Sequence, residues 1–250
     1  MAEEKKKKGS LKRKVLTWII VLGISVTFAS VLCGIFIFKH EISEVYNTEG
    51  YQIAATTEQF YGDDMKRYTD VLNRMIKGED VAAEVEEIRS SERYKEIHDL
   101  QETLRRQMEV NDIYVCVVDY DNLLELQGVK ENGCLYYVMD CYYMEEEEFA
   151  YGHVDNVNLN KMDIVEETWR TGIRTDSFIM INGKYGYNTT AFYPVLNEEG
   201  KTIAAIGVEV PMSTLQTDMA FFMLRVSLVS IIVVILIIWL MSASITRRVI

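Results

Sequence analysis

One carboxylate, Glu209, stands in an otherwise apolar segment and is the residue of this sequence best suited to bind a ligand. It lies near the end of residues 202–210, TIAAIGVEV, whose alternation is typical of a β-strand. Alternate side chains of a strand point to opposite faces, so Glu209 shares a face with Ile203, Ala205 and Gly207. These small side chains leave room above the sheet, and a carboxylate at the edge of that room can bind a cation or a hydrogen-bond donor. The alternative is that Glu209 faces solvent.

Seven further residues are expected to join Glu209 in a ligand site: Tyr136, Trp169, Arg170, Arg174, Tyr187, Thr189 and Tyr193. Residues 185–196 form a predicted neighbouring strand with Tyr187, Thr189, Ala191 and Tyr193 on one face and Asn188, Thr190 and Phe192 on the other. Aromatic side chains with polar tips suit small-ligand sites, and an arginine can hold a ligand carboxylate through its planar guanidinium. The aromatic residues could instead fill a core, and the arginines could lie on the surface.

Signals for metal binding and catalysis are weak. The three histidines, His40, His98 and His153, are scattered without metal-ligand spacing. Residues 119–130 begin like a calcium loop, but they lack the glycine at the sixth position and carry Lys130 at the twelfth, where a bidentate glutamate is needed. No nucleophile, phosphate-loop or dinucleotide motif is present in the sequence. We therefore predict no enzyme activity, metal site or cofactor for these residues.

Two apolar stretches are long enough to cross a membrane. Residues 15–38 contain no charged residue and residues 219–243 contain one, Arg225, whereas a helix needs about 20 apolar residues to span a bilayer. The alternatives, a cleaved signal peptide for the first and a core helix for the second, fit less well, because the first is too long and the second is apolar on every face. Basic residues precede the first stretch and follow the second, which predicts that both termini are cytoplasmic.

The predicted organisation has five parts: a basic cytoplasmic N-terminus (1–14), a transmembrane helix (15–38), an extracellular domain (39–218), a second transmembrane helix (219–243) and a cytoplasmic end (244–250). The extracellular part holds 16 Lys and Arg against 36 Asp and Glu. This acidity argues against nucleic acid or anionic lipid as the partner of that domain. Of its three cysteines, Cys134 and Cys141 could pair, or all three could be free thiols.

Helices are predicted for residues 39–111 and a sheet for residues 113–210 of this domain. Apolar residues at helical spacing predict one long helix from residue 39 that ends near Gly78, then helices capped by Asp80 and by Ser90 or Ser91. Five strands are predicted at 113–118, 134–143, 177–181, 185–196 and 202–210, with a short helix at 162–171. Turns are expected at 119–122, at Asn182-Gly183 and at 197–200, so that the last three strands form a meander.

The ordered set of these features resembles the Cache family, the PAS-like extracytoplasmic sensor module of bacterial transmembrane receptors. The matching parts are the long membrane-proximal helix, residues 94–111 leading into IYVCVVDYDN, Tyr185-Gly186, TTAFYPV with Pro194, and GKTIAAIGVEV. Glu209 stands where the family commonly has Asp, and that acidic residue often points at the ligand. Residues 242–250, SASITRRVI, resemble the opening of a HAMP linker but lack its usual proline.

The resemblance implies an α+β fold, in which two transmembrane helices flank a single Cache (PAS-like) domain with a long N-terminal helix and a five-stranded antiparallel sheet. It further implies a homodimeric receptor region that senses a small extracellular solute, an amino acid or carboxylate-like compound, and that contacts membrane lipid but no nucleic acid. A histidine kinase, diguanylate cyclase, phosphatase or chemoreceptor signalling domain would follow. The alternative is a membrane-anchored protein-interaction or dimerisation ectodomain without a small-molecule ligand.

Overall fold

The computed structural model describes residues 2–126, 133–141, 150–157, 161–175, 180–183, 186–211 and 213–249. The chain forms two compact units. The helical unit comprises Met1–Ile42 and Thr214–Ile250, and the α+β unit comprises Ser43–Ser213. One boundary between the units falls inside helix α1 (Ala2–Tyr61), and the other falls at the start of helix α7 (Ser213–Val249).

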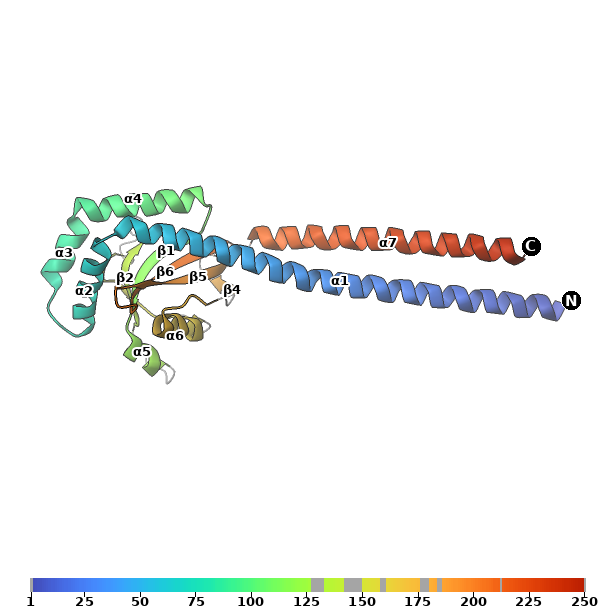
Figure 1. Cartoon of the computed structure of the whole chain (residues 1–250), viewed down its shortest axis with the longest axis horizontal. Coiled ribbons are helices and arrows are strands. Elements are labelled where there is room, and N and C mark those ends of the chain that lie inside the picture. The colour runs from blue at the N-terminus through green and yellow to red at the C-terminus, as the bar shows by residue number, and fades with distance from the viewer. Residues whose placement is uncertain are drawn as a thin grey trace. The chain divides into compact units, whose positions relative to one another are not determined.

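The helical unit is built from two apolar helical segments, which are parts of α1 and α7 (Figure 1). Thr17–Ile37 and Ala220–Leu240, 21 residues each, are long and apolar enough to cross a membrane, and they lie within the two predicted spans. Their most apolar windows are 0% buried, so neither segment serves as a core helix of the part of the chain that is described. The two segments pack closely at Gly23, where an added Cβ would lie 2.8 Å from Val234 Cγ1.

A six-stranded antiparallel sheet forms the centre of the α+β unit (Figure 1). The strand order is β3-β2-β1-β6-β5-β4. The strands are β1 (Asp112–Val118), β2 (Leu135–Asp140), β3 (Val154–Asp155), β4 (Met180–Gly183), β5 (Gly186–Leu196) and β6 (Thr202–Pro211). The five predicted strands are all present, and β4, β5 and β6 form the predicted meander. The short edge strand β3 was not predicted, because two residues are too few to show an alternating pattern.

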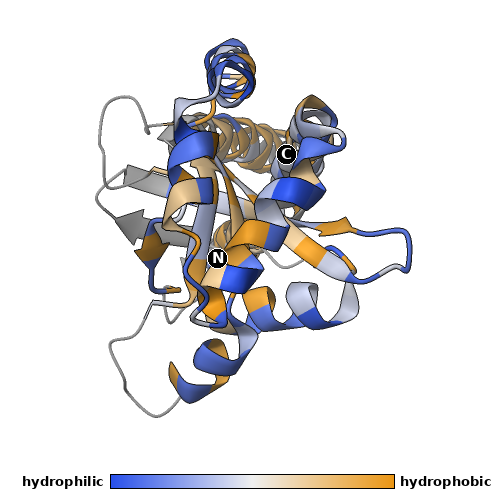
Figure 2. Ribbon diagram, turned by 90° about the vertical axis from the view of Figure 1, so that its left-hand side faces the viewer, coloured by the Kyte–Doolittle hydropathy of each residue, from blue (hydrophilic) through white to orange (hydrophobic). Residues whose placement is uncertain are grey.

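Five further helices belong to the α+β unit: α2 (Asp64–Ile76), α3 (Ala82–Ser90), α4 (Glu92–Gln107), α5 (Tyr120–Glu125) and α6 (Met162–Thr171). Hydrophilic and hydrophobic residues alternate along these ribbons, as expected for helices that cover a sheet (Figure 2). The predicted cap of α4 is confirmed, since Ser91 Oγ accepts a hydrogen bond of 3.2 Å from Tyr94 N. The predicted helix 162–171 is also confirmed, and it ends at Gly172 in the left-handed conformation, with φ 65°.

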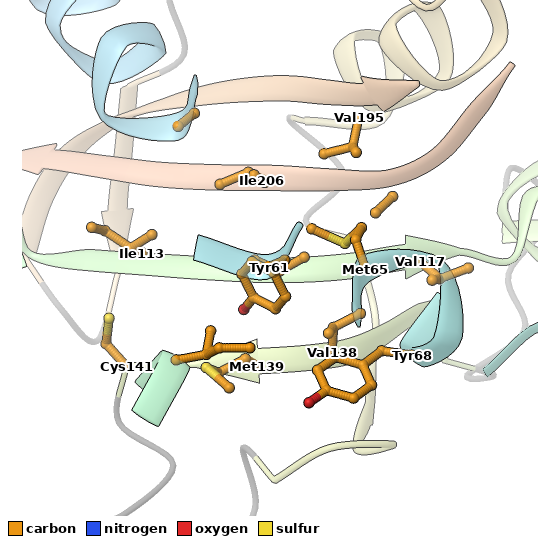
Figure 3. Packing of buried hydrophobic residues seen from close by; sticks show 14 of the residues in the cluster. Tyr61, Met65, Tyr68, Ile113, Val117, Val138, Met139, Cys141, Val195 and Ile206 are labelled. Atoms are coloured by element: carbon orange, nitrogen blue, oxygen red, sulfur yellow. The ribbon is translucent and has the colours of Figure 1, made fainter. Parts of the chain in front are cut away.

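The first face of the sheet packs against helices α1, α2 and α4 (Figure 3). β6 contributes Ile206, Val208 and Val210, the apolar face expected to contact a helix. At this interface, four buried tyrosines meet edge to face, with neighbouring ring centroids 5.9–6.4 Å apart: Tyr61, Tyr68, Tyr94 and Tyr151. Tyr94 and Tyr151 donate from their hydroxyl groups to the carbonyl oxygens of Val138 and Tyr68, so the polar tips are satisfied inside the core.

The second face of the sheet packs against α5 and α6. Tyr114, Phe192 and Ala205 from three adjacent strands form a cluster with Leu123 of α5 and Val165 of α6. This second core encloses most of the face that carries Glu209, so Glu209 lies at the end of a covered surface.

The predicted helix from residue 39 to near Gly78 is wrong, because α1 ends at Tyr61 and α2 begins at Asp64. Gly62 adopts φ 49° at the break, a conformation that glycine tolerates and that interrupts a helix. The apolar spacing continues across the break, since Met65 and Tyr68 of α2 enter the same core. For that reason the periodicity of the sequence did not reveal the change of direction.

Two predicted turns also differ from the structure. Asn182 and Gly183 are the last residues of β4, and the final paired residues of this hairpin are Gly183 and Gly186. The connection is therefore at residues 184–185, outside the described residues. The predicted turn at 119–122 is instead the start of α5, because Asp119 Oδ1 accepts a hydrogen bond of 3.2 Å from Asn122 N and caps a short helix.

All four cysteines are free: Cys33, Cys116, Cys134 and Cys141. Of the two alternatives that the spacing left open, a disulfide between Cys134 and Cys141 or free thiols, the structure has the free thiols. Burial raises the pKa of Cys116 and Cys141, so both thiols are protonated at neutral pH and act as small apolar side chains.

Candidate functional site

Glu209 lies on the second face of the sheet, flanked by a polar residue on each neighbouring strand. On one side it pairs with Asp112 of β1, and on the other side with Thr190 of β5. Directly paired residues point to the same face of a sheet, so these three side chains form one row across three strands. The Glu209 side chain is 14% exposed, which contradicts the alternative that it simply faces solvent.

Two side chains hold the Glu209 carboxylate. Lys161, next to the start of α6, places Nζ 3.3 Å from Glu209 Oε1 and is itself 13% exposed. Asn188 Nδ2 donates to Glu209 Oε2 at 3.0 Å, and Asn111 Nδ2 donates to Asn188 Oδ1. The backbone is also tied, because Asn111 N donates to the carbonyl oxygen of Glu209 at 2.8 Å. The last residues of β6 are therefore linked to β1, β5 and α6 through polar groups.

A second buried carboxyl group, Asp112, lies beside Glu209. Burial raises the pKa of Asp112 well above its ordinary value, and the nearby charges of Asp140 and Glu209 raise it further. Asp112 is 8% exposed, and its Oδ1 has no hydrogen-bond partner among the described residues. Thr190 Oγ1 is likewise buried without a partner in the described part of the chain. We call Asp112, Asp140, Lys161, Asn188 and Glu209 the Glu209 cluster.

The volume expected above Ala205 and Gly207 is filled. The ring of Tyr114 lies over Gly207, and an added Cβ at Gly207 would come within 2.1–2.5 Å of that ring. Burial raises the pKa of Tyr114 well above its ordinary value, with a further increase from the charge of Glu209. The small residues of β6 therefore accommodate an aromatic side chain of β1. The polar side chains that flank Glu209 lie near the end of β6.

Three of the predicted partners of Glu209 lie on or toward the first face of the sheet. Thr189 pairs with Val210, and Tyr193 pairs with Ile206, so both point away from Glu209. Tyr136 is partly buried against the first-face core. Thr189 Oγ1 is buried there without a hydrogen-bond partner in the described residues. The alternation of β5 placed these residues correctly on one face, but the sequence did not reveal which face of β5 adjoins Glu209.

The other predicted partners are also dispersed. Trp169 of α6 packs against both cores, and Arg170 is exposed at the end of α6. Arg174 is exposed, with its guanidinium carbon 5.0 Å from the centre of the Tyr51 ring. The side chain of Tyr187 lies outside the described residues. None of these described side chains contacts the Glu209 carboxylate.

Two of the dispersed residues meet in a different place, a hollow of about 250 Å³ on the α+β unit. We call it the Arg174 pocket, and six residues line it: Glu58, Gly172, Arg174, Tyr193, Pro194 and Leu196. Burial raises the pKa of Glu58, and a hydrogen bond from Tyr193 partly offsets this increase.

Sequence reasoning missed four residues of the Glu209 cluster. The alternation of β5 predicts that Asn188 lies on the same face as Thr190, the face that adjoins Glu209, but Asn188 was not predicted to be a site residue. Asp112 is the first residue of β1, and its position beside Glu209 depends on the pairing of β1 with β6, two strands about ninety residues apart in the sequence. No local signal indicates Asp140 or Lys161. Among the described residues, no group of His, Cys, Asp or Glu is suited to hold a metal ion.

Comparisons with known proteins yielded one similarity to report. No protein-family model matches the sequence, and no curated protein matches it. Among solved structures, the periplasmic sensory domain of a Campylobacter jejuni chemoreceptor matches with 16% sequence identity and a TM-score of 0.26. The match covers 70% of this chain. It covers 64% of the chemoreceptor domain, so this chain spans less than two thirds of the length of that domain.

Proposed function

We propose that this chain is the sensing and membrane-spanning region of a bacterial two-pass receptor. Residues 39–218 lie outside the cell, both termini are cytoplasmic, and the α+β unit binds a small solute at the Glu209 cluster. Residues 242–250 begin a HAMP-like linker to a signalling domain of histidine kinase, diguanylate cyclase, phosphatase or chemoreceptor type. The proposal includes no catalytic step. The two apolar helical segments, one before and one after the α+β unit in the sequence, support the membrane arrangement.

The observation that carries this proposal is that polar side-chain oxygens near the end of β6 are buried without hydrogen-bond partners among the described residues. A buried acceptor without a hydrogen bond costs about 1–3 kcal/mol, so an oxygen such as Asp112 Oδ1 is a favourable place for a ligand donor. β6 ends at Pro211, and only residue 212 separates it from α7, which contains the second apolar span. A solute that contacts Glu209 thus binds four residues before that helix begins.

The charges of the cluster favour a solute that carries an ammonium group. Asp112, Asp140 and Glu209 bring three carboxyl groups, whereas Lys161 is the only basic residue of the cluster. An ammonium group can donate to these oxygens and lower the repulsion between them. Amino acids and simple amines meet this requirement, but a carboxylate without an amine would add to the repulsion. We therefore narrow the expected ligands to amine-bearing solutes.

Signalling requires that the solute bind two states of the receptor with different affinity. We propose that the chain works as a homodimer, and that binding favours one arrangement of the end of β6. The hydrogen bonds and the ion pair that link Glu209 to the ends of β1, β5 and α6 support this two-state mechanism. A ligand that competes for the Glu209 carboxylate must change at least one of these interactions.

The test is thermal unfolding of the full chain in lipid nanodiscs against a panel of amino acids, amines and carboxylates. A ligand at about 100 times its Kd stabilises the folded state by about 2.7 kcal/mol, which raises Tm by about 5–10 °C for a domain of this size. We expect this shift for an amine-bearing solute in the unaltered chain and in Glu198→Gln, an exposed control. For an amine that lacks a carboxylate, the shift should disappear in Glu209→Gln.

Two outcomes would contradict the proposal. The first is a shift of equal size in Glu209→Gln for an amine that lacks a carboxylate, which would place the ligand elsewhere. The second is a panel without any shift together with tight self-association, which would support a membrane-anchored interaction module.

A further inference from the structure

The Arg174 pocket lies apart from the Glu209 cluster and has the composition of a binding site in its own right. It is formed by the last turn of α1, the segment that follows α6 and the end of β5. Its wall includes Tyr193, which points to the first face of the sheet, whereas Glu209 points to the second. Its volume of about 250 Å³ is below the usual range for drug-sized ligands, so it suits a molecule of a few heavy atoms.

One side of the pocket offers a positioned guanidinium group. Arg174 stacks over Tyr51, with Cζ 5.0 Å from the ring centre, and the Tyr51 hydroxyl donates to the carbonyl oxygen of Thr175. The ring and this hydrogen bond hold the arginine and the next residue against α1. Among the ion pairs of the described residues, none includes Arg174. Its planar edge can therefore donate two parallel hydrogen bonds to a carboxylate.

The other side of the pocket offers an acceptor. Glu58 is partly buried in the last turn of α1 and accepts a hydrogen bond from the hydroxyl group of Tyr193. A carboxylate has about four acceptor positions, so this bond leaves capacity for a donor on a ligand. Glu58 and Arg174 line the same hollow, and no ion pair among the described residues joins them. Two opposite charges that face one cavity without pairing are complementary to a molecule with an anionic end and a donor end.

We propose that the Arg174 pocket binds a small carboxylate that carries a hydrogen-bond donor, an amino or hydroxyl group, on the neighbouring carbon atom. The carboxylate of the ligand binds Arg174, and the donor binds Glu58. Pro194 and Leu196 provide an apolar wall for a short side chain. Because Glu58 belongs to α1, which also contains the first apolar span, the ligand would contact the chain segment that enters that span.

The test is calorimetric titration of the full chain in lipid nanodiscs with four probes of similar size: glycine, glycolate, acetate and methylamine. Glycine and glycolate differ only in the donor, acetate lacks the donor, and methylamine lacks the carboxylate. In a Glu209→Gln background, which removes the Glu209 cluster as a binding site, we expect glycine or glycolate to bind about 10-fold or more tightly than acetate, and methylamine not to bind, because each lost charged hydrogen bond weakens binding by about that factor. The stronger of the two identifies the donor.

Variants of the pocket assign the binding to its residues. Arg174→Gln should weaken the better probe about 10-fold or more. Glu58→Gln should weaken glycine more than glycolate, because an amide oxygen accepts from a hydroxyl group but provides no charge for an ammonium group. Glu58→Gln is nearly isosteric, so it tests the pocket even if Arg174→Gln disturbs the contact between Arg174 and Tyr51. Unfolding curves of both variants would reveal such a disturbance.

The effect of Glu209→Gln distinguishes binding at the Arg174 pocket from binding at the Glu209 cluster. Binding of the better probe should be unchanged in Glu209→Gln, because Glu209 lies on the opposite face of the sheet. Binding that is lost in Glu209→Gln but kept in Arg174→Gln would overturn the inference and support the Glu209 cluster. No binding of either glycine or glycolate, or equal binding in the wild type, Arg174→Gln and Glu58→Gln, would also overturn it.

Discussion

Replacing Asp112 by asparagine should stabilise the protein at neutral and alkaline pH. Asp112 is 8% exposed, its Oδ1 has no hydrogen-bond partner among the described residues, and the charges of Asp140 and Glu209 act on it. Asparagine has nearly the same shape, bears no charge, and can donate to the neighbouring carboxylates. Relief of an unsatisfied buried group is worth about 1–3 kcal/mol. A gain of about 2 kcal/mol would raise Tm by about 4–8 °C for a domain of this size.

The effect of Asp112→Asn should depend on pH in a defined direction. The folded-state pKa of Asp112 is raised well above its ordinary value, so the folded protein keeps a proton that the unfolded chain releases. Below the unfolded pKa of about 3.9, the carboxyl is neutral in both states and causes no loss. As pH rises through the folded pKa, the wild type loses stability and the asparagine variant does not. The difference between them should therefore be small near pH 4 and largest at pH 8.

The assay is thermal unfolding of the full chain in lipid nanodiscs at a series of pH values, followed by near-ultraviolet circular dichroism. Asp70→Asn is the matched control, because Asp70 is exposed on α2 and should show no gain at any pH. A loss of stability in Asp112→Asn at pH 8, or a gain that is equal at pH 4 and pH 8, would refute the electrostatic reasoning.

Three further predictions test the packing, the helix capping and the membrane arrangement. Gly207→Ala should destabilise the protein by about 1–3 kcal/mol in chemical unfolding, because its Cβ would collide with the Tyr114 ring, and most of this loss should vanish in a Tyr114→Leu background. Ser91→Ala should cost about 1 kcal/mol in the same measurement through loss of the α4 cap, and an unchanged unfolding midpoint would count against that cap. In intact cells a membrane-impermeant maleimide should label Lys95→Cys but not Lys14→Cys, and the reverse pattern would invert the proposed topology. The native cysteines of the α+β unit are buried, which keeps the background of that labelling low.

Much of the α+β unit was predictable because its signals are local. Residues 202–210 alternate between apolar and small or polar positions, and β6 forms there with its apolar face against the helices. Ser91 caps α4 as predicted, and Gly172 follows the last residue of α6 as predicted. Strand and helix periods are properties of short segments, so the chain shows them without any knowledge of its partners.

Other features depended on which segments meet. The break at Gly62 was hidden because the apolar spacing continues through it into the same core. The room expected above Gly207 is occupied by Tyr114, a residue of a strand far away in the sequence. Composition alone could not show that one glycine faces a ring and another faces open space.

The sequence by itself determined the two apolar segments, the five main strands and the apolar and polar faces of β6, because each follows from the order of residues within one short segment. Only the tertiary structure decided which side chains join Glu209. Pairing of β1 and β5 with β6 places Asp112 and Thr190 beside it and sends Thr189 and Tyr193 to the opposite face. The physical reason is register: a shift of one residue between paired strands exchanges the two faces, and register depends on contacts between distant segments.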